Sequence, residues 1–219
     1  MSIRSIAFLI LSGLQVFSAD SNASESARAT LALAAPRSDW LTVAKSMEQR
    51  RDWPGLLEVG QRWTLAEPDN ATAWFVLGRA NSELKRFPEA IAAYQQDLRV
   101  EPGDVYARNN LGNAYRNSRL YNEAMNAYHD AVRLDPDYIP AWHNLGITFY
   151  ALKGTAGVAR ALQRLRSTDP ELAEAWRKLA MEYAVSRDER VALEAVKVMK
   201  GLDETKRERM FDILLNPTE

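Results

Sequence analysis

Four prolines stand at a constant interval in the sequence. Pro68, Pro102, Pro136 and Pro170 follow one another in steps of 34 residues. Each of them follows an acidic residue and ends a stretch with helical periodicity, because proline cannot continue a helix. New helices are then expected to open at Asn70, Asp104 and Asp137, which are suitable N-cap residues. A fixed period of this length is typical of stacked helical units, each of which buries its apolar face against its neighbours.

The residues between these prolines repeat with the same period. We divide this part of the chain into five units, which are residues 37–70, 71–104, 105–138, 139–172 and 173–206. The fourth position of the units holds Trp40, Trp74, Arg108, Trp142 and Trp176. The seventh and eighth positions hold a large apolar residue beside a very small one, as in Leu111-Gly112. Because the small residue lets a second helix cross closely, each unit is expected to form two antiparallel helices.

These positions resemble the tetratricopeptide (TPR) repeat. The units that begin at residues 71 and 105 carry the pattern most fully, with Trp74, Leu77, Gly78, Phe87, Ala90, Tyr94 and Pro102, and with Leu111, Gly112, Tyr115, Tyr121, Ala124, Tyr128, Ala131 and Pro136. The resemblance covers residues 37–206 and weakens outward, since Lys153-Gly154-Thr155 stands where an aromatic turn is expected. It implies an all-α, right-handed superhelical solenoid of about five helix-turn-helix units.

The two ends of the chain differ from the repeats. Residues 1–23 combine Arg4, an apolar run and small residues, which is typical of an export signal cut between residues 18 and 23. The apolar run is much shorter than the ~20 residues that cross a bilayer. We therefore expect no membrane span after cleavage, a flexible leader at residues 24–36, and a periplasmic or secreted protein. At residues 203–219 a capping-box spacing predicts a helix that closes the stack, followed by a tail.

The composition argues against several kinds of site. The chain has no cysteine and two histidines, which leaves little for a metal centre. A net charge of -1 argues against a nucleic-acid binder. No phosphate loop, hydrolase or zinc-protease motif occurs. His129 is expected on an outward, solvated face, and His143 in the groove without a carboxylate partner. We therefore expect no enzymatic activity, no cofactor and no metal.

By resemblance, the concave groove is lined by the first helix of each unit. The candidate peptide-binding residues on these helices are Arg79, Asn109, Asn110, Asn113, Arg116, His143, Asn144, Arg177 and Lys178. An asparagine side chain both donates and accepts, so it can hydrogen-bond the main chain of an extended peptide of any sequence. The arginines and the lysine would attract carboxylates.

The sequence therefore predicts a protein-interaction scaffold or adaptor that holds an extended segment or tail of a partner, in envelope complex assembly. A permanent structural subunit of an envelope complex, or a regulatory partner of a separate enzyme, remains an alternative, and the oligomeric state stays open. A strict carboxylate clamp of the kind that binds chaperone tails is not expected. Asn109 and Glu174 stand where that clamp requires lysines.

Overall fold

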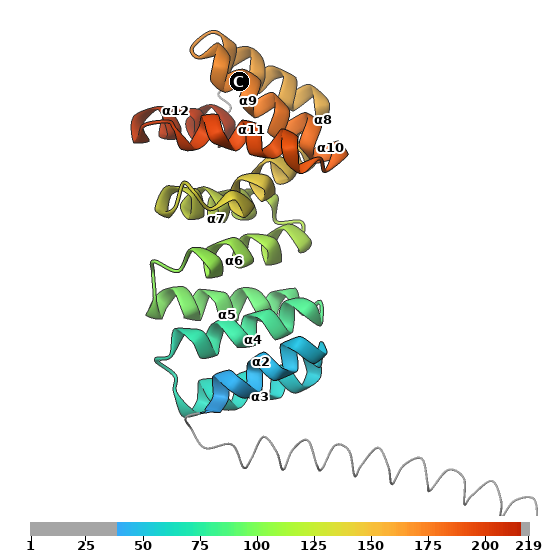
Figure 1. Ribbon diagram of the computed structural model, residues 1–219, viewed down its shortest axis with the longest axis vertical. Helices are drawn as coiled ribbons and strands as arrows, with labels where there is room; N and C mark the ends of the chain where they lie inside the picture. The colour runs from blue at the N-terminus through green and yellow to red at the C-terminus, as the bar shows by residue number, and fades with distance from the viewer. Residues whose placement is uncertain (1–38, 216–219) are drawn as a thin grey trace, which may run out of the picture.

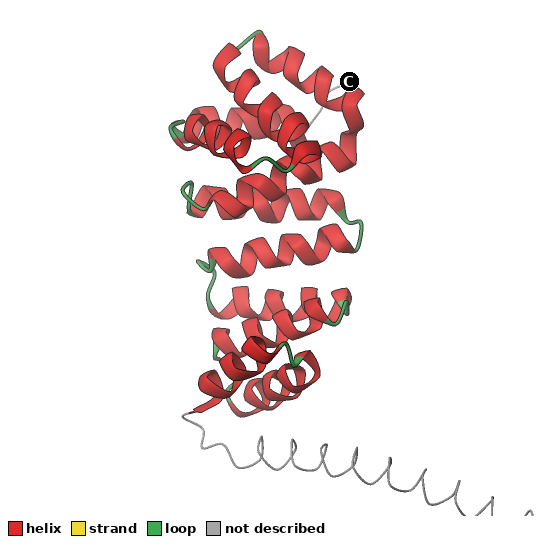
Figure 2. Cartoon of the chain, turned by 45° about the vertical axis from the view of Figure 1, so that its right-hand side comes forward, coloured by secondary structure: helices red, strands yellow, loops and turns green. Residues whose placement is uncertain are grey.

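The computed structural model describes residues 39–215, and all regular structure in that range is helical (Figures 1 and 2). The expected export signal at residues 1–23 and the leader at residues 24–36 lie outside the described residues. The helices stack on one another along the chain (Figure 1). This arrangement confirms the all-α solenoid that the repeat predicted.

The first three units each contain two antiparallel helices. These are α2 (Trp40–Arg50) with α3 (Trp53–Ala66), α4 (Ala71–Glu83) with α5 (Phe87–Val100), and α6 (Val105–Asn117) with α7 (Tyr121–Leu134). Asn70 and Asp104 begin α4 and α6 as expected, because each side chain accepts the backbone N–H three residues on, at 3.4 and 2.8 Å. The third expected N-cap is wrong: Tyr138 precedes the next helix, and Asp137 pairs with Lys200 at 2.8 Å.

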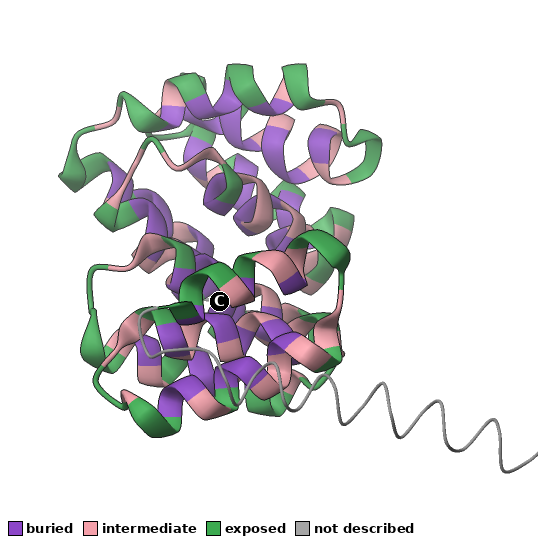
Figure 3. Ribbon diagram, turned by 60° about the horizontal axis from the view of Figure 1, so that its bottom comes forward, coloured by how far each residue is buried: buried purple, intermediate pink, exposed green. Residues whose placement is uncertain are grey.

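Glycines stand where two helices of one unit cross. A Cβ atom on Gly112 would lie 2.5 Å from the ring of Tyr128, and one on Gly78 would lie 2.7 Å from the ring of Tyr94. Both tyrosines are fully buried. Buried residues face the neighbouring helices, whereas exposed residues cover the turns and outer faces (Figure 3). Small residues opposite large rings therefore set the spacing of the stack.

The fourth unit lacks a normal turn between its helices. α8 (Ile139–Arg166) runs through both of them and is interrupted at Gly154, where φ is 61° and ψ is -179°. This backbone conformation is essentially restricted to glycine. Gly154 therefore replaces the aromatic turn of the regular units with a sharp kink.

The fifth unit departs from regular α-helix. Its first helix begins as α9 (Pro170–Arg177), widens into the π-helical segment η2 (Lys178–Tyr183) and ends as α10 (Ala184–Ser186). Its second helix is α11 (Glu189–Lys200). In a π-helix each hydrogen bond spans one more residue, so the side chains after η2 are rotated relative to an α-helix.

The last helix, α12 (Glu204–Leu215), folds back against α7 and α8. Asp203 caps it by accepting the N–H of Lys206 at 2.8 Å, so the helix starts earlier than the expected capping box. Met210, Phe211 and Leu214 are buried in the same core as Trp142. The expectation that this helix simply closes the end of the stack is therefore incomplete, since it also covers the third unit.

The position of His129 on α7 differs from the expectation. Its ring lies 3.8 Å from that of Phe211, and its Nε2 lies 3.3 Å from Glu208 Oε1. The expected solvated histidine is in fact covered by α12, whose return could not be read from the repeat pattern.

Candidate functional site

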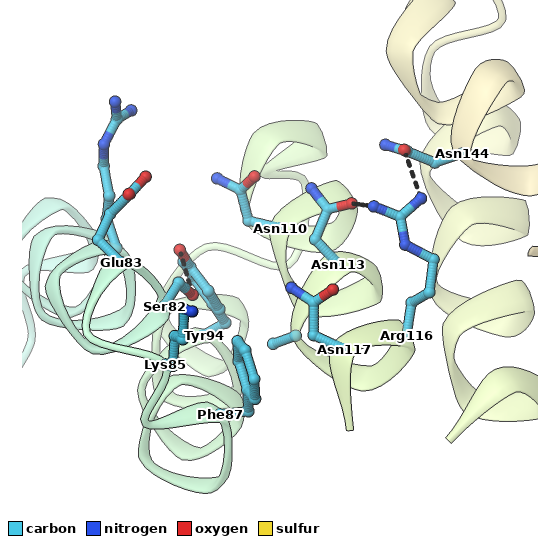
Figure 4. Close-up of a pocket in the computed structure, with 12 residues that line it drawn as sticks. Ser82, Glu83, Lys85, Phe87, Tyr94, Asn110, Asn113, Arg116, Asn117 and Asn144 are labelled. Atoms are coloured by element: carbon cyan, nitrogen blue, oxygen red, sulfur yellow. Dashed lines mark hydrogen bonds between the residues drawn. The ribbon is translucent and has the colours of Figure 1, made fainter. Parts of the chain in front are cut away.

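A hollow of about 860 Å³ opens between the second, third and fourth units. Its lining comes from α4, the turn after α4, α5, α6 and α8, and consists of Arg79, Ser82, Glu83, Lys85, Phe87, Tyr94, Asn110, Asn113, Ala114, Arg116, Asn117 and Asn144. Most of these side chains are polar and point toward the hollow (Figure 4). We call this hollow the groove.

A hydrogen-bond network holds one side of the groove. Arg116 donates to the Oδ1 atoms of Asn144 and Asn113 at 2.9 and 3.2 Å (Figure 4). Tyr128 also donates to Asn113 Oδ1, at 2.9 Å, and Asn144 donates to Asn109 at 2.9 Å. The guanidinium of Arg116 is therefore fixed by neutral amide oxygens, and it has no carboxylate partner among residues 39–215.

Asn110 differs from its neighbours. Its side chain points into the groove (Figure 4), and no other described residue hydrogen-bonds it. Asn117 also lines the groove without a side-chain partner in the described chain. These amides thus keep their donors and acceptors for a ligand.

Five of the nine predicted residues line the groove, namely Arg79, Asn110, Asn113, Arg116 and Asn144. Asn109 lies beneath them, 5% exposed, and accepts the amide of Asn144. It supports the groove surface and does not form part of it. His143, Arg177 and Lys178 lie outside the lining of the groove.

The predicted role of the cations as free carboxylate ligands changes in the structure. Arg79 lies 3.0 Å from Glu48, and Lys178 lies 2.7 Å from Glu194. Arg177 pairs with Glu174 at 2.7 Å and with Glu182 at 2.6 Å, and these bonds raise the pKa of its guanidinium. Acids of the same chain thus neutralise three of the four cations. Arg116 alone, of those four, keeps an unneutralised charge.

His143 has a carboxylate partner, contrary to the expectation from the sequence. Its Nδ1 lies 3.5 Å from Glu189 Oε2, and its ring lies 4.5 Å from the ring of Tyr183. Burial lowers the pKa of this imidazole, while Glu189 opposes that effect. Since Glu189 follows His143 by more than one 34-residue unit, only the packing of α11 on the fourth unit brings them together.

The aromatic floor of the groove was also missed. Phe87 and Tyr94 of α5 line it, although their positions predicted only core packing. The hydroxyl of Tyr94 lies 3.5 Å from Ser82 Oγ, and burial raises the pKa of Tyr94 to about 12. The groove therefore combines an aromatic floor with amide and guanidinium walls.

Two further findings bear on the chemistry of the described chain. Between residues 39 and 215 no cluster of His, Asp or Glu could hold a metal ion. No helix in this range is long and apolar enough to cross a membrane.

Comparisons with known proteins agree with the repeat. The model of the family described as "TPR repeat" matches residues 121–153, and the one described as "Tetratricopeptide repeat" matches residues 59–98. No curated protein matches the chain by sequence.

Solved structures with the same fold are similar over most of the chain. MamA is 19% identical with a TM-score of 0.53, covering 80% of this chain and 95% of MamA. The thermophilic TPR protein TTC0263 of Thermus thermophilus is 20% identical with a TM-score of 0.50, covering 82% of this chain and 100% of that protein.

The O-GlcNAc transferase of Thermobaculum terrenum is 24% identical with a TM-score of 0.51, covering 60% of this chain. This chain spans only 26% of the transferase. At these identities the structures support the fold alone. Together with the family matches, they show that the chain contains tetratricopeptide repeats.

Proposed function

We propose that this protein is a non-enzymatic interaction scaffold that holds an extended segment or tail of a partner protein in the groove. The observation that carries the proposal is Arg116, a cation held in place by Asn113 and Asn144 without an acidic partner among residues 39–215. A preorganised guanidinium of this kind binds a carboxylate with little further loss of side-chain freedom.

The amides beside Arg116 supply the second part of the recognition. Asn110 and Asn117 face the groove with free donors and acceptors, which suit the N–H and C=O groups of an extended backbone. The partly exposed ring of Phe87, beside the buried Tyr94, offers contact area to an apolar side chain. Repeats of this kind generally mediate protein–protein interaction, which supports a protein partner.

The place of action is part of the proposal and depends on residues 1–23. Their charged and apolar pattern favours export, so we place the scaffold in a cell envelope, where it would assist complex assembly. The intact mass of the protein recovered from the envelope fraction tests this point. A full-length chain in the cytoplasm would contradict export without affecting the groove.

Site-specific photo-crosslinking tests the groove. A photoreactive residue at position 110 should capture a partner segment that mass spectrometry identifies, whereas the same label at the outward-facing Asn126 should not. Calorimetry with the identified segment should then show about ten-fold weaker binding to Arg116→Gln than to the native chain. Capture only at position 126 would contradict the groove and favour a structural subunit that packs through its outer face.

A further inference from the structure

The connections between helices lie on two opposite edges of the stack. Because successive helices are antiparallel, turns within a unit lie on one edge and connections between units on the other (Figures 1 and 2). We call the first the basic edge, formed by residues 51–52, 84–86, 118–120, 153–154 and 187–188. We call the second the acidic edge, formed by residues 67–70, 101–104, 135–138, 167–169 and 201–203.

The basic edge carries a cation at the same position of every unit, together with the two acids Asp52 and Asp188. The cations are Arg51, Lys85, Arg119, Lys153 and Arg187. With 28 Lys and Arg in 219 residues, composition alone would put a cation at about one position in eight. Four of the five have φ between 54° and 62°, a left-handed conformation that glycine adopts without strain. A cation thus recurs at a position where its backbone conformation is unfavourable.

The acidic edge carries the opposite charge. Its acids are Glu67, Asp69, Glu101, Asp104, Asp135, Asp137, Asp169 and Asp203, and its described connections contain no Lys or Arg. Helix dipoles do not explain this separation. Each unit places one helix N-terminus and one helix C-terminus on each edge. Helix dipoles would therefore favour acidic and basic residues equally on the two edges.

Asp137 of the acidic edge pairs with Lys200 at 2.8 Å, but other charges on the two edges have no such partner. No described side chain pairs with Arg51, Lys85 or Arg119, and Arg187 lies only over the ring of Tyr183, at 5.9 Å. On the acidic edge, Asp69 and Glu101 are exposed and have no side-chain partner in the described range. Each edge therefore presents some charge that no residue in 39–215 pairs with.

Exposed apolar side chains accompany the acidic edge. Leu65, Val100 and Leu134 lie in the last turns of the helices that lead into it, and Tyr106 lies just after it. Their exposed fractions are 84%, 40%, 46% and 62%, respectively. Apolar contact area within a charged surround is typical of a protein–protein interface, and it favours a protein over a simple polyanion.

We propose that this partner is a second copy of the chain, with the basic edge of one copy lying along the acidic edge of the next. Both edges belong to the same repeat, so their charges have the same spacing and come into register when two copies lie parallel. The net charge of the chain is -1, so the electrostatic repulsion between two copies is weak. Since the two edges differ, each pair keeps one free edge of each kind, and association continues into open rows.

Sedimentation of the native chain and of two charge-reversed variants tests this proposal. Arg51→Glu/Arg119→Glu removes the net positive charge of the basic edge, and Asp69→Lys/Glu101→Lys halves the net negative charge of the acidic edge. The native chain should associate with increasing concentration at low salt and dissociate at high salt, because exposed ion pairs are screened. Each variant alone should associate at least ten-fold more weakly, and an equimolar mixture of the two should recover the association.

Lys45→Glu/Arg160→Glu is the matched control, since it makes the same charge change as the first variant on exposed helix surfaces away from both edges. It should associate like the native chain, and circular dichroism should show that all variants are folded. A native chain that stays monomeric at low salt overturns the proposal. So does a mixture that fails to recover, or a control that weakens as much as the edge variants.

Discussion

Asp97 is a buried acid in the middle of the stack. It stands in the second unit where the third unit has Ala131, it is 0% exposed, and neither of its carboxylate oxygens has a partner in the described chain. Burial, with Asp104 and Glu101 nearby, raises the pKa of Asp97 to about 7. Because the folded pKa exceeds the unfolded one, the native state binds the proton more tightly. The free energy of unfolding should therefore fall as the pH rises from about 4 to 7.

Replacing Asp97 by the alanine of the neighbouring unit tests this. Asp97→Ala removes a buried charge without a partner and should stabilise the protein at pH 8 by about 1–3 kcal/mol. The gain should shrink at pH 5, where Asp97 is mostly protonated in the native state. Urea unfolding at both pH values measures it, with Glu89→Ala, an exposed acid on the same helix, as control. If Asp97→Ala instead lowered the free energy of unfolding equally at both pH values, the unpaired carboxylate would not destabilise the native state.

The tryptophan column shows what a sequence can and cannot predict about a residue. Trp74 and Trp142 donate their indole N–H to the carbonyl oxygens of Pro68 and Pro136, at 2.7 and 3.0 Å. Arg108 makes the equivalent bond to Pro102 at 2.6 Å. The positions of this column can be predicted from the 34-residue period alone. The hydrogen bond that Arg108 shares with the two tryptophans cannot, because an indole and a guanidinium resemble each other only in where they place an N–H donor.

Truncation of two residues in this column should give unequal losses. Trp142→Ala should cost about 3–5 kcal/mol of unfolding free energy, since Trp142 is 0% exposed and stacks on Phe211. Arg108→Ala, on a partly exposed side chain, should cost about 1 kcal/mol. Chemical denaturation compares them. Equal losses of unfolding free energy would mean that the buried Trp142 contributes no more to stability than the partly exposed Arg108.

At the scale of the helices, the regular units were predictable and the irregular ones were not. A pattern of large and small residues at 3.6-residue spacing defines a crossing such as that of Gly112 over Tyr128. The same spacing cannot distinguish an α-helix from the π-helical η2, because its 6 residues are too few to show a different periodicity. Nor does it locate the kink at Gly154 or the return of α12, which depend on contacts between distant units.

The crossing at Gly112 links stability to the groove. Gly112→Leu should displace the ring of Tyr128 and cost ~1–3 kcal/mol or more, because the Cβ would lie 2.5 Å from that ring. Tyr128 also donates to Asn113, so binding in the groove should weaken as well. Gly103→Ala is the control, since nothing lies within 4 Å of its added Cβ. Circular dichroism melting should show an unchanged midpoint for the control and a lower one for Gly112→Leu.

The whole described molecule has three separate buried clusters, which do not contribute equally to its stability. One covers α2 to α4, a second joins α5 to α6 and α7, and the largest extends from α7 to α12. The second cluster contains few residues and lies beside the groove, and Asp97 is buried without a partner in α5. In a stack of repeats, stability is a sum of the stabilities of the units and of the contacts between neighbours. The junction of α5 with α6 should therefore open before the units themselves unfold.

Native-state hydrogen exchange tests this order. Amides of α7 and α8 should exchange most slowly, and α2 to α5 should exchange together through an opening of lower free energy. Asp97→Ala removes the unpaired charge from the junction, so it should slow exchange in α2 to α5 at pH 8 and leave α7 and α8 nearly unchanged. Uniform protection from α2 to α12, or an equal effect of the substitution in every helix, would show that the stack opens as a single cooperative unit.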